Sequence, residues 1–249
     1  MRYVAIGDSF TEGVGDELPD GTARGWADLV AAGLAAAEGP IEYANLAIRG
    51  RLLEPIIREQ LPAALALSPP PTLLSLNGGG NDMMRPGMVA ERLVELTLQA
   101  VRRCAEAGVR LLLLSGADPS ERLPFGSMMR RRGEMLTEAI RPFAKEFDLT
   151  FVDVFHDREI RRAAYWSADR LHLNAAGHRR VAGLVLTALG HSTEAHVIDP
   201  GPEEPRRVLA EARYYREHVL PWVNRRLRGH SSGDDRTGKY EKWVPIEAA

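Results

Sequence analysis

Short, mainly apolar runs alternate along this chain with longer stretches in which apolar residues recur every three or four positions. The short runs cover residues 2–6, 41–45, 72–76, 109–114 and 150–154. The longer stretches cover residues 26–37, 52–67, 88–107, 128–147 and 177–189. Apolar runs of four to six residues are typical of strands buried on both faces, and the longer periodicity is typical of helices. The alternation predicts an α/β domain with five parallel strands and helices on both faces of the sheet.

The C-terminal part of the chain departs from this alternation. Residues 191–205 are rich in glycine and proline and predict a linker, which leaves residues 1–190 as the α/β domain. Residues 206–249 carry ten Lys and Arg against six Asp and Glu, so this extension is mildly basic. We expect it to be partly helical over 206–228, and the polar stretch 229–242 predicts a disordered end.

Composition narrows the classes of protein that the chain can belong to. A formal net charge of -2 gives no reason to expect nucleic acid or an anionic membrane as a partner. The single cysteine, Cys104, excludes an internal disulfide and a cysteine-based metal cluster. No run is long and apolar enough to span a membrane, and no secretory signal precedes the first strand, so we expect a cytoplasmic protein. The histidines lack ligand spacing, so neither a metal nor a cofactor is expected.

Small or polar residues follow the predicted strands at the points where a crevice would form. Ser9 follows the first strand, Gly50 lies in the loop after the second, and Asn81 lies in a glycine-rich turn after the third. The carboxyl ends of parallel strands share one edge of a sheet, where open α/β sheets bind ligands. These three residues are therefore predicted to meet there.

A fourth polar segment lies between the last strand and the last helix. In it Asp169 and His172 are three residues apart, so one turn can place both side chains on the same side. Serine is a weak nucleophile at neutral pH and needs a base, and a histidine base works better when a carboxylate orients it. Ser9, His172 and Asp169 supply these roles. The N–H groups of Ser9 and Gly50 and the Asn81 amide could stabilise an oxyanion.

Taken together, these residues resemble the four sequence blocks of the SGNH/GDSL hydrolases, a family of serine esterases and lipases. The matching blocks, in order, are Gly7-Asp8-Ser9, Gly50, Gly79-Gly80-Asn81-Asp82 and Asp169-x-x-His172. The resemblance covers about residues 2–190 and implies a three-layer α/β/α, flavodoxin-like fold. It also implies a catalytic triad of Ser9, Asp169 and His172, with an oxyanion hole formed by Ser9, Gly50 and Asn81. Ala47 stands where many members of the family have glycine, which leaves the shape of the adjacent pocket open.

The expected activity is hydrolysis of a small or medium acyl ester, with a small-molecule ester as the partner of the site. Two other functions are compatible with parts of the sequence. The same triad could pass the acyl group to a sugar or another alcohol, which would make the protein an acyltransferase. A signalling receiver domain would also place acidic residues such as Asp8 and Asp82 after the first and third strands. It would, however, require a lysine after the fifth strand, and residues 150–155 contain none. The basic extension could add a binding role, and the sequence does not indicate the oligomeric state.

Overall fold

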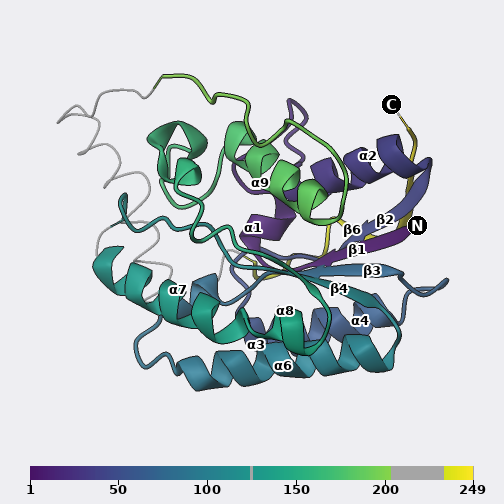
Figure 1. Cartoon of the computed structure of the whole chain (residues 1–249), viewed down its shortest axis with the longest axis horizontal. Coiled ribbons are helices and arrows are strands. Elements are labelled where there is room, and N and C mark those ends of the chain that lie inside the picture. Colours follow the sequence, from purple (N-terminus) through teal and green to yellow (C-terminus); the bar gives the residue numbers. More distant parts are fainter. Residues whose placement is uncertain (124–125, 203–232, 249) are drawn as a thin grey trace.

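One sheet of six strands forms the centre of the molecule (Figure 1). The computed structural model describes residues 1–123, 126–202 and 233–248. The strands are β1 (Arg2–Ile6), β2 (Ile41–Asn45), β3 (Leu73–Leu76), β4 (Arg110–Leu114), β5 (Thr150–Val152) and β6 (Tyr240–Ile246). Their order across the sheet is β5-β4-β3-β1-β2-β6. The chain therefore reverses direction across the sheet at β1, and the crevice of such a fold opens at this reversal.

The five strands predicted from the sequence are all present and parallel to one another, and three-layer α/β/α packing is confirmed. The helices are α1 (Ser9–Glu12), α2 (Trp26–Glu38), α3 (Leu53–Pro55), α4 (Leu61–Leu65), α5 (Gly80–Met83), α6 (Ala90–Glu106), α7 (Gly126–Ile140), α8 (Phe143–Glu146) and α9 (Ala175–Ala188). Helices α2 and α9 cover one face of the sheet, and α3, α4, α6, α7 and α8 cover the other (Figure 1).

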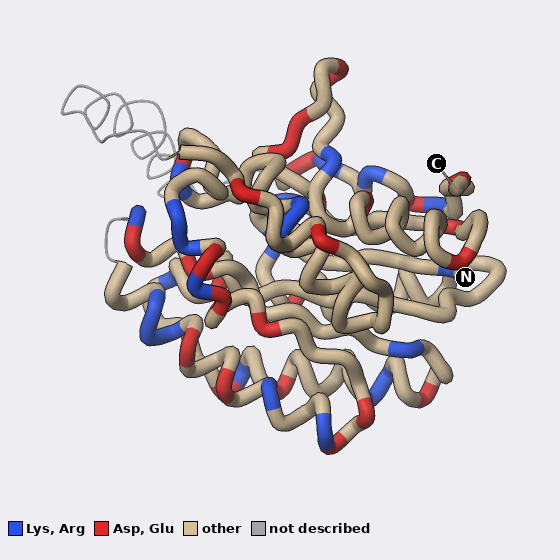
Figure 2. Tube along the Cα trace, turned by 45° about the horizontal axis from the view of Figure 1, so that its top comes forward, with Lys and Arg blue, Asp and Glu red and all other residues tan. Residues whose placement is uncertain are grey.

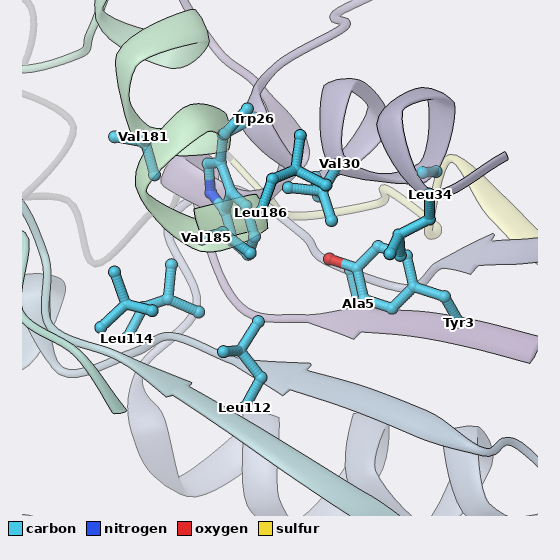
Figure 3. Close-up of a cluster of buried hydrophobic side chains, with 14 of the residues drawn as sticks. Tyr3, Ala5, Trp26, Val30, Leu34, Leu112, Leu114, Val181, Val185 and Leu186 are labelled. Carbon is cyan, nitrogen blue, oxygen red and sulfur yellow. The ribbon is translucent and has the colours of Figure 1, made fainter. Parts of the chain in front are cut away.

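Two hydrophobic clusters, one on each face of the sheet, hold these layers together. Successive side chains of a strand point to opposite faces. Tyr3 and Ala5 of β1 accordingly pack with α2 and α9, as Figure 3 shows, whereas Val4 and Ile6 pack with the helices of the opposite face. Because β1 is buried on both sides, its mainly apolar sequence has no polar alternation.

Prolines divide two of the predicted helices. The stretch 52–67 becomes α3, a π-helical turn over Ile56–Gln60, and α4, and Pro62 lies in the first turn of α4. The stretch 128–147 becomes α7 and α8, with Pro142 immediately before α8. Proline has no N–H to donate and its ring clashes with the preceding turn, so a continuous helix is disfavoured at both places.

The sixth strand corrects the sequence prediction. The sheet is mixed and has six strands, because β6 pairs with β2 in the antiparallel direction. The disorder predicted for 229–242 is therefore wrong for residues 240–242, and also for 233–239, which pack against other parts of the chain. Residues 229–232 lie outside the described residues. Polar residues such as Lys242 remain exposed because β6 is an edge strand, and an edge also tolerates Pro245. The predicted helix over 206–228 lies outside the described residues.

Charged side chains of both signs are interspersed along the outer helices (Figure 2). Some form ion pairs at helical spacing, such as Arg58 with Glu54 and Arg141 with Glu138, each at 2.8 Å. Exposed pairs of this kind contribute little to folding. Among the helices of the described residues, none combines the length and the apolar character that crossing a bilayer requires.

Candidate active site

Ser9, His172 and Asp169 form one hydrogen-bonded chain, although 163 residues separate the serine from the histidine. The Ser9 Oγ lies 3.0 Å from the Nε2 of His172, and the Nδ1 of His172 lies 2.5 Å from the Oδ2 of Asp169. Ser9 is the first residue of α1, directly after the sharp turn that ends β1. The structure therefore brings together the three residues predicted to act as nucleophile, base and orienting acid.

Hydrogen bonds between its own residues stabilise the loop that carries Asp169 and His172. The Oδ1 of Asp169 accepts from the Ser167 hydroxyl at 2.7 Å and from the His172 N–H at 3.0 Å. Asn174 caps α9, because its side-chain oxygen accepts from the first N–H groups of that helix. The same side chain donates to the carbonyl of Ala164. The histidine is thus held by its own turn and by the helix that follows it.

The charge on Asp169 determines which nitrogen of His172 carries the proton. Burial by itself would raise the pKa of Asp169, but hydrogen bonds from His172 and Ser167 hold that pKa well below its usual value. An ionised carboxylate can only accept hydrogen bonds, so the Nδ1 of His172 donates to Asp169. In the neutral imidazole the Nε2 then carries no proton and can accept the hydroxyl proton of Ser9, as a general base must.

The three residues predicted for the oxyanion hole come from the ends of β1, β2 and β3. The Nδ2 of Asn81 donates to the Oδ2 of Asp8 at 3.1 Å and to the carbonyl oxygen of Arg51 at 3.1 Å. Asp8 directly precedes Ser9, and Arg51 directly follows Gly50. Asn81 therefore links the two loops that carry the other predicted donors.

The backbone N–H groups of Ser9 and Gly50 are free to bind an oxyanion within the described residues, whereas the side-chain amide of Asn81 is already hydrogen-bonded. Within the described residues, the N–H groups of Ser9 and Gly50 donate no hydrogen bond to another part of the chain. The amide of Asn81, by contrast, already has two acceptors. An oxyanion at this place would receive the two backbone donors directly and would share a hydrogen of Asn81 with Asp8 or Arg51.

A second pair with the same local geometry follows β5. Asp153 and His156 are also three residues apart, with 2.8 Å between the His156 Nδ1 and the Asp153 Oδ2, and the His156 N–H donates to the same carboxylate. The Nε2 of His156, however, lies 3.8 Å from Glu138 rather than beside a serine hydroxyl. The prediction from the sequence did not pair these two residues, although their spacing equals that of Asp169 and His172. What distinguishes His172 is its contact with Ser9.

A family comparison agrees with the fold. The model of the GDSL-like lipase/acylhydrolase family matches residues 5–180, a span that includes Ser9, Gly50, Asn81, Asp169 and His172. This chain belongs to the GDSL-like lipase/acylhydrolase family. Membership in this hydrolase family excludes the receiver domain that the acidic residues had suggested. No curated protein matches the chain by sequence.

Solved structures with the same fold are distant from this member of the family in sequence. TesA has a TM-score of 0.62 at 24% identity, over 76% of this chain and 98% of its own. The esterase EstA from Pseudoalteromonas sp. has a TM-score of 0.60 at 19% identity, over 76% and 97%. The acetylxylan esterase Axe2 from Geobacillus stearothermophilus has a TM-score of 0.63 at 21% identity, over 77% and 94%. At these identities the likeness establishes the fold.

One residue that supports the site was not predicted from the sequence. The buried side chain of Gln60, in the π-helical turn, accepts from the Gly7 N–H at 2.8 Å and donates to the Gly7 carbonyl at 3.0 Å. It thereby holds both backbone groups of the residue at the end of β1. A glutamine in a helical stretch carries no sequence signal for such a contact, because its partner lies 53 residues away.

Replacing Asn81 by alanine tests the oxyanion hole. Loss of one donor is expected to lower kcat by about 10²–10³-fold and to change KM little, because the donor acts mainly on the transition state. Steady-state kinetics on a chromogenic ester, with the melting temperature as a folding control, measures this. An Asn81→Ala variant with wild-type kcat would remove the amide from the proposed oxyanion hole.

Asp8 predicts a pH dependence of stability. Burial raises the pKa of Asp8 to about 6, although the Phe10 N–H and the Asn81 amide favour its charged form. A folded-state pKa above the unfolded value means that the stabilisation is complete below about pH 4 and is lost as the pH rises through about 6. The loss amounts to at most about 3 kcal/mol.

Asp8→Asn removes this titration. Between pH 4 and pH 7 the melting temperature of the variant should therefore rise relative to that of the wild type, and thermal melts at a series of pH values measure the difference. A difference that stays constant across this range would show that Asp8 does not titrate there.

Proposed function

We propose that this protein is a serine esterase that hydrolyses small or medium acyl esters through an acyl-enzyme intermediate on Ser9. The observation that carries the proposal is the hydrogen-bonded chain from Ser9 through His172 to Asp169. A histidine with its Nε2 3.0 Å from a serine hydroxyl is within reach of the proton that it must remove.

In the first half of the reaction, the Ser9 Oγ attacks the ester carbonyl while the Nε2 of His172 takes the hydroxyl proton. The resulting oxyanion receives hydrogen bonds from the N–H groups of Ser9 and Gly50 and from the amide of Asn81. His172 then returns its proton to the departing alkoxide, so the alcohol leaves and the acyl group stays on Ser9. The Asp169 carboxylate stabilises the imidazolium between these two proton transfers.

In the second half, a water molecule enters where the alcohol left, and His172 removes one of its protons. The hydroxide oxygen attacks the acyl carbonyl, and the bond to the Ser9 Oγ breaks as His172 protonates that oxygen. The products are a carboxylic acid and the free enzyme. An alcohol or sugar in place of water would give a new ester by the same steps, which is the acyltransferase alternative.

The neighbours in fold support ester chemistry without fixing a substrate. EstA is described as an esterase inhibited by monoethylphosphonate, and Axe2 as an acetylxylan esterase. Phosphonates resemble the tetrahedral intermediate of acyl transfer, so we expect them to react with Ser9 as well.

Hydrolysis of p-nitrophenyl esters from acetate to decanoate, by the wild type and by Ser9→Ala, tests the proposal. We expect release that depends on Ser9 and an optimum at one chain length, which would define the acyl site. Faster p-nitrophenol release on addition of a sugar or alcohol, with formation of the corresponding ester, would instead assign the protein as an acyltransferase. Equal release by the wild type and by Ser9→Ala would contradict both assignments.

A further inference from the structure

Lys239, close to the C-terminus, places its ammonium group inside the body of the protein. Its Nζ donates to the carbonyl oxygens of Glu12, Ala23 and Arg24, at 3.0, 2.5 and 2.9 Å, and lies 2.7 Å from the Oδ2 of Asp28. Only 10% of the lysine side chain is exposed. Burial of an ammonium group is costly unless its donors are satisfied, so these contacts fix the position of Lys239.

One of these contacts reaches the segment that carries Ser9. Glu12 is the last residue of α1, the four-residue helix that Ser9 begins. The side chain of Glu12 accepts from the Arg49 backbone N–H at 2.6 Å and from the Arg49 guanidinium at 2.6 and 2.8 Å. Arg49 directly precedes Gly50. Lys239 therefore contacts the main chain of Glu12, and the side chain of Glu12 binds Arg49. Arg49 lies in the loop that carries Gly50, a predicted oxyanion donor.

Two glycines bring the same C-terminal segment against this loop. A Cβ atom on Gly233 would lie 2.0 Å from the carbonyl oxygen of Arg49, and one on Gly238 would lie 2.7 Å from the Cα of Leu46. No side chain fits at such distances, so only glycine allows the two backbones to approach. Residues 233–239 therefore lie directly against the loop 46–50.

We propose that residues 233–239 form a brace, a segment that holds the loop 46–50 and helix α1 in the positions that the reaction requires. Lys239 is its positioning residue. The inference rests on the proposed function, since the brace acts through groups assigned there. The family match ends at residue 180, so the brace lies outside the shared domain. The functional unit of this chain is therefore the catalytic domain together with its C-terminal segment, rather than residues 1–190 alone.

The brace is expected to act on the rate of reaction more than on substrate binding. A shift of an oxyanion donor by about 1 Å from the productive geometry costs on the order of 10²-fold in rate. Lys239→Met keeps the unbranched apolar stem of the side chain and removes the charged group with its hydrogen bonds. We expect kcat to fall by about 10–100-fold while KM changes little.

Lys242→Met is the matched control, because Lys242 is exposed in β6, three residues after Lys239. Both variants are made in the full chain and compared by kinetics and by hydrogen exchange. In Lys239→Met the amides of residues 46–50 and 10–14 should exchange faster, and in Lys242→Met they should exchange as in the wild type. Propylamine should restore part of the activity of Lys239→Ala, because it can supply the missing ammonium group.

Wild-type kcat together with wild-type exchange in Lys239→Met would overturn the proposal. If Lys239→Met does not fold, Gly238→Ala tests the same proposal. The added methyl group should displace the brace, lower kcat and speed exchange of the amides of residues 46–50. Unchanged kcat and unchanged exchange in Gly238→Ala would contradict the proposal. The exchange measurement requires no turnover. An error in the proposed function would appear as activity independent of Ser9, whereas an error in the brace would appear as unchanged exchange.

Discussion

Replacing His172 by alanine is expected to lower kcat for ester hydrolysis by about 10⁴–10⁶-fold, because Ser9 then has no base. Replacing His156 by alanine should leave kcat close to that of the wild type. Both histidines follow an aspartate by three residues and bond to it through Nδ1, at 2.5 and 2.8 Å. Only His172 reaches Ser9, so this pair of variants separates contact with the nucleophile from the local Asp-x-x-His geometry.

Steady-state kinetics of the two variants on one p-nitrophenyl ester measures the effect, and melting temperatures control for folding. His172→Ala should remain folded, since His172 is partly exposed and its loop is also held by Asn174. Comparable losses of activity in both variants would mean that the histidines act through the fold. Wild-type activity in His172→Ala would eliminate it as the base.

Asp169→Asn is expected to lower kcat by about 10⁴-fold, the second large effect that the site predicts. An asparagine side chain can donate to the Nδ1 of His172. The proton of the ring would then move to Nε2, which could no longer accept the Ser9 hydroxyl proton. The binding of substrate should change little, because Asp169 acts through the histidine. The loss should therefore appear in kcat more than in KM.

Asp153→Asn provides the matched control for this change. Asp153 accepts from the Arg141 guanidinium at 2.5 Å as well as from His156, so its loss should lower the melting temperature and leave kcat near the wild-type value. If Asp169→Asn lowered only the melting temperature, as expected for Asp153→Asn, the result would contradict the proposed role of Asp169 in orienting His172. Measurement of kcat, KM and melting temperature for both variants distinguishes the two outcomes.

The sequence predicted the parts of the fold that depend on local pattern. The first two strands were predicted with the bounds that the structure has, because short apolar runs ended by polar residues define a buried parallel strand. Ser9, Gly50, Asn81 and the Asp169-x-x-His172 pair could be placed at one edge of the sheet for the same reason. The Asp153–His156 pair has the same spacing, and the contact with Ser9 in the folded structure is what sets His172 apart.

Features that depend on contacts between distant parts of the chain could not be predicted. Strand β6 overlaps the polar stretch 229–242 at its first three residues, and it pairs with β2 because the chain returns to the free edge of the sheet. Lys239 contacts Glu12 across 227 residues, and Gln60 contacts Gly7 across 53. In the sequence, nothing marks Lys239 or Gln60 as buried. Only the folded structure shows the backbone carbonyl groups to which they donate hydrogen bonds.

The most direct test of the central claim, that Ser9 is a nucleophile activated by His172, is covalent labelling with a fluorophosphonate. Peptide mass spectrometry locates the label, and its rate of formation is compared in the wild type, Ser9→Ala, His172→Ala and His156→Ala. We predict a single label on Ser9, no label in Ser9→Ala, labelling slowed by orders of magnitude in His172→Ala and the wild-type rate in His156→Ala. Labelling of another residue with Ser9 unmodified, or an equal rate in His172→Ala, would contradict the account.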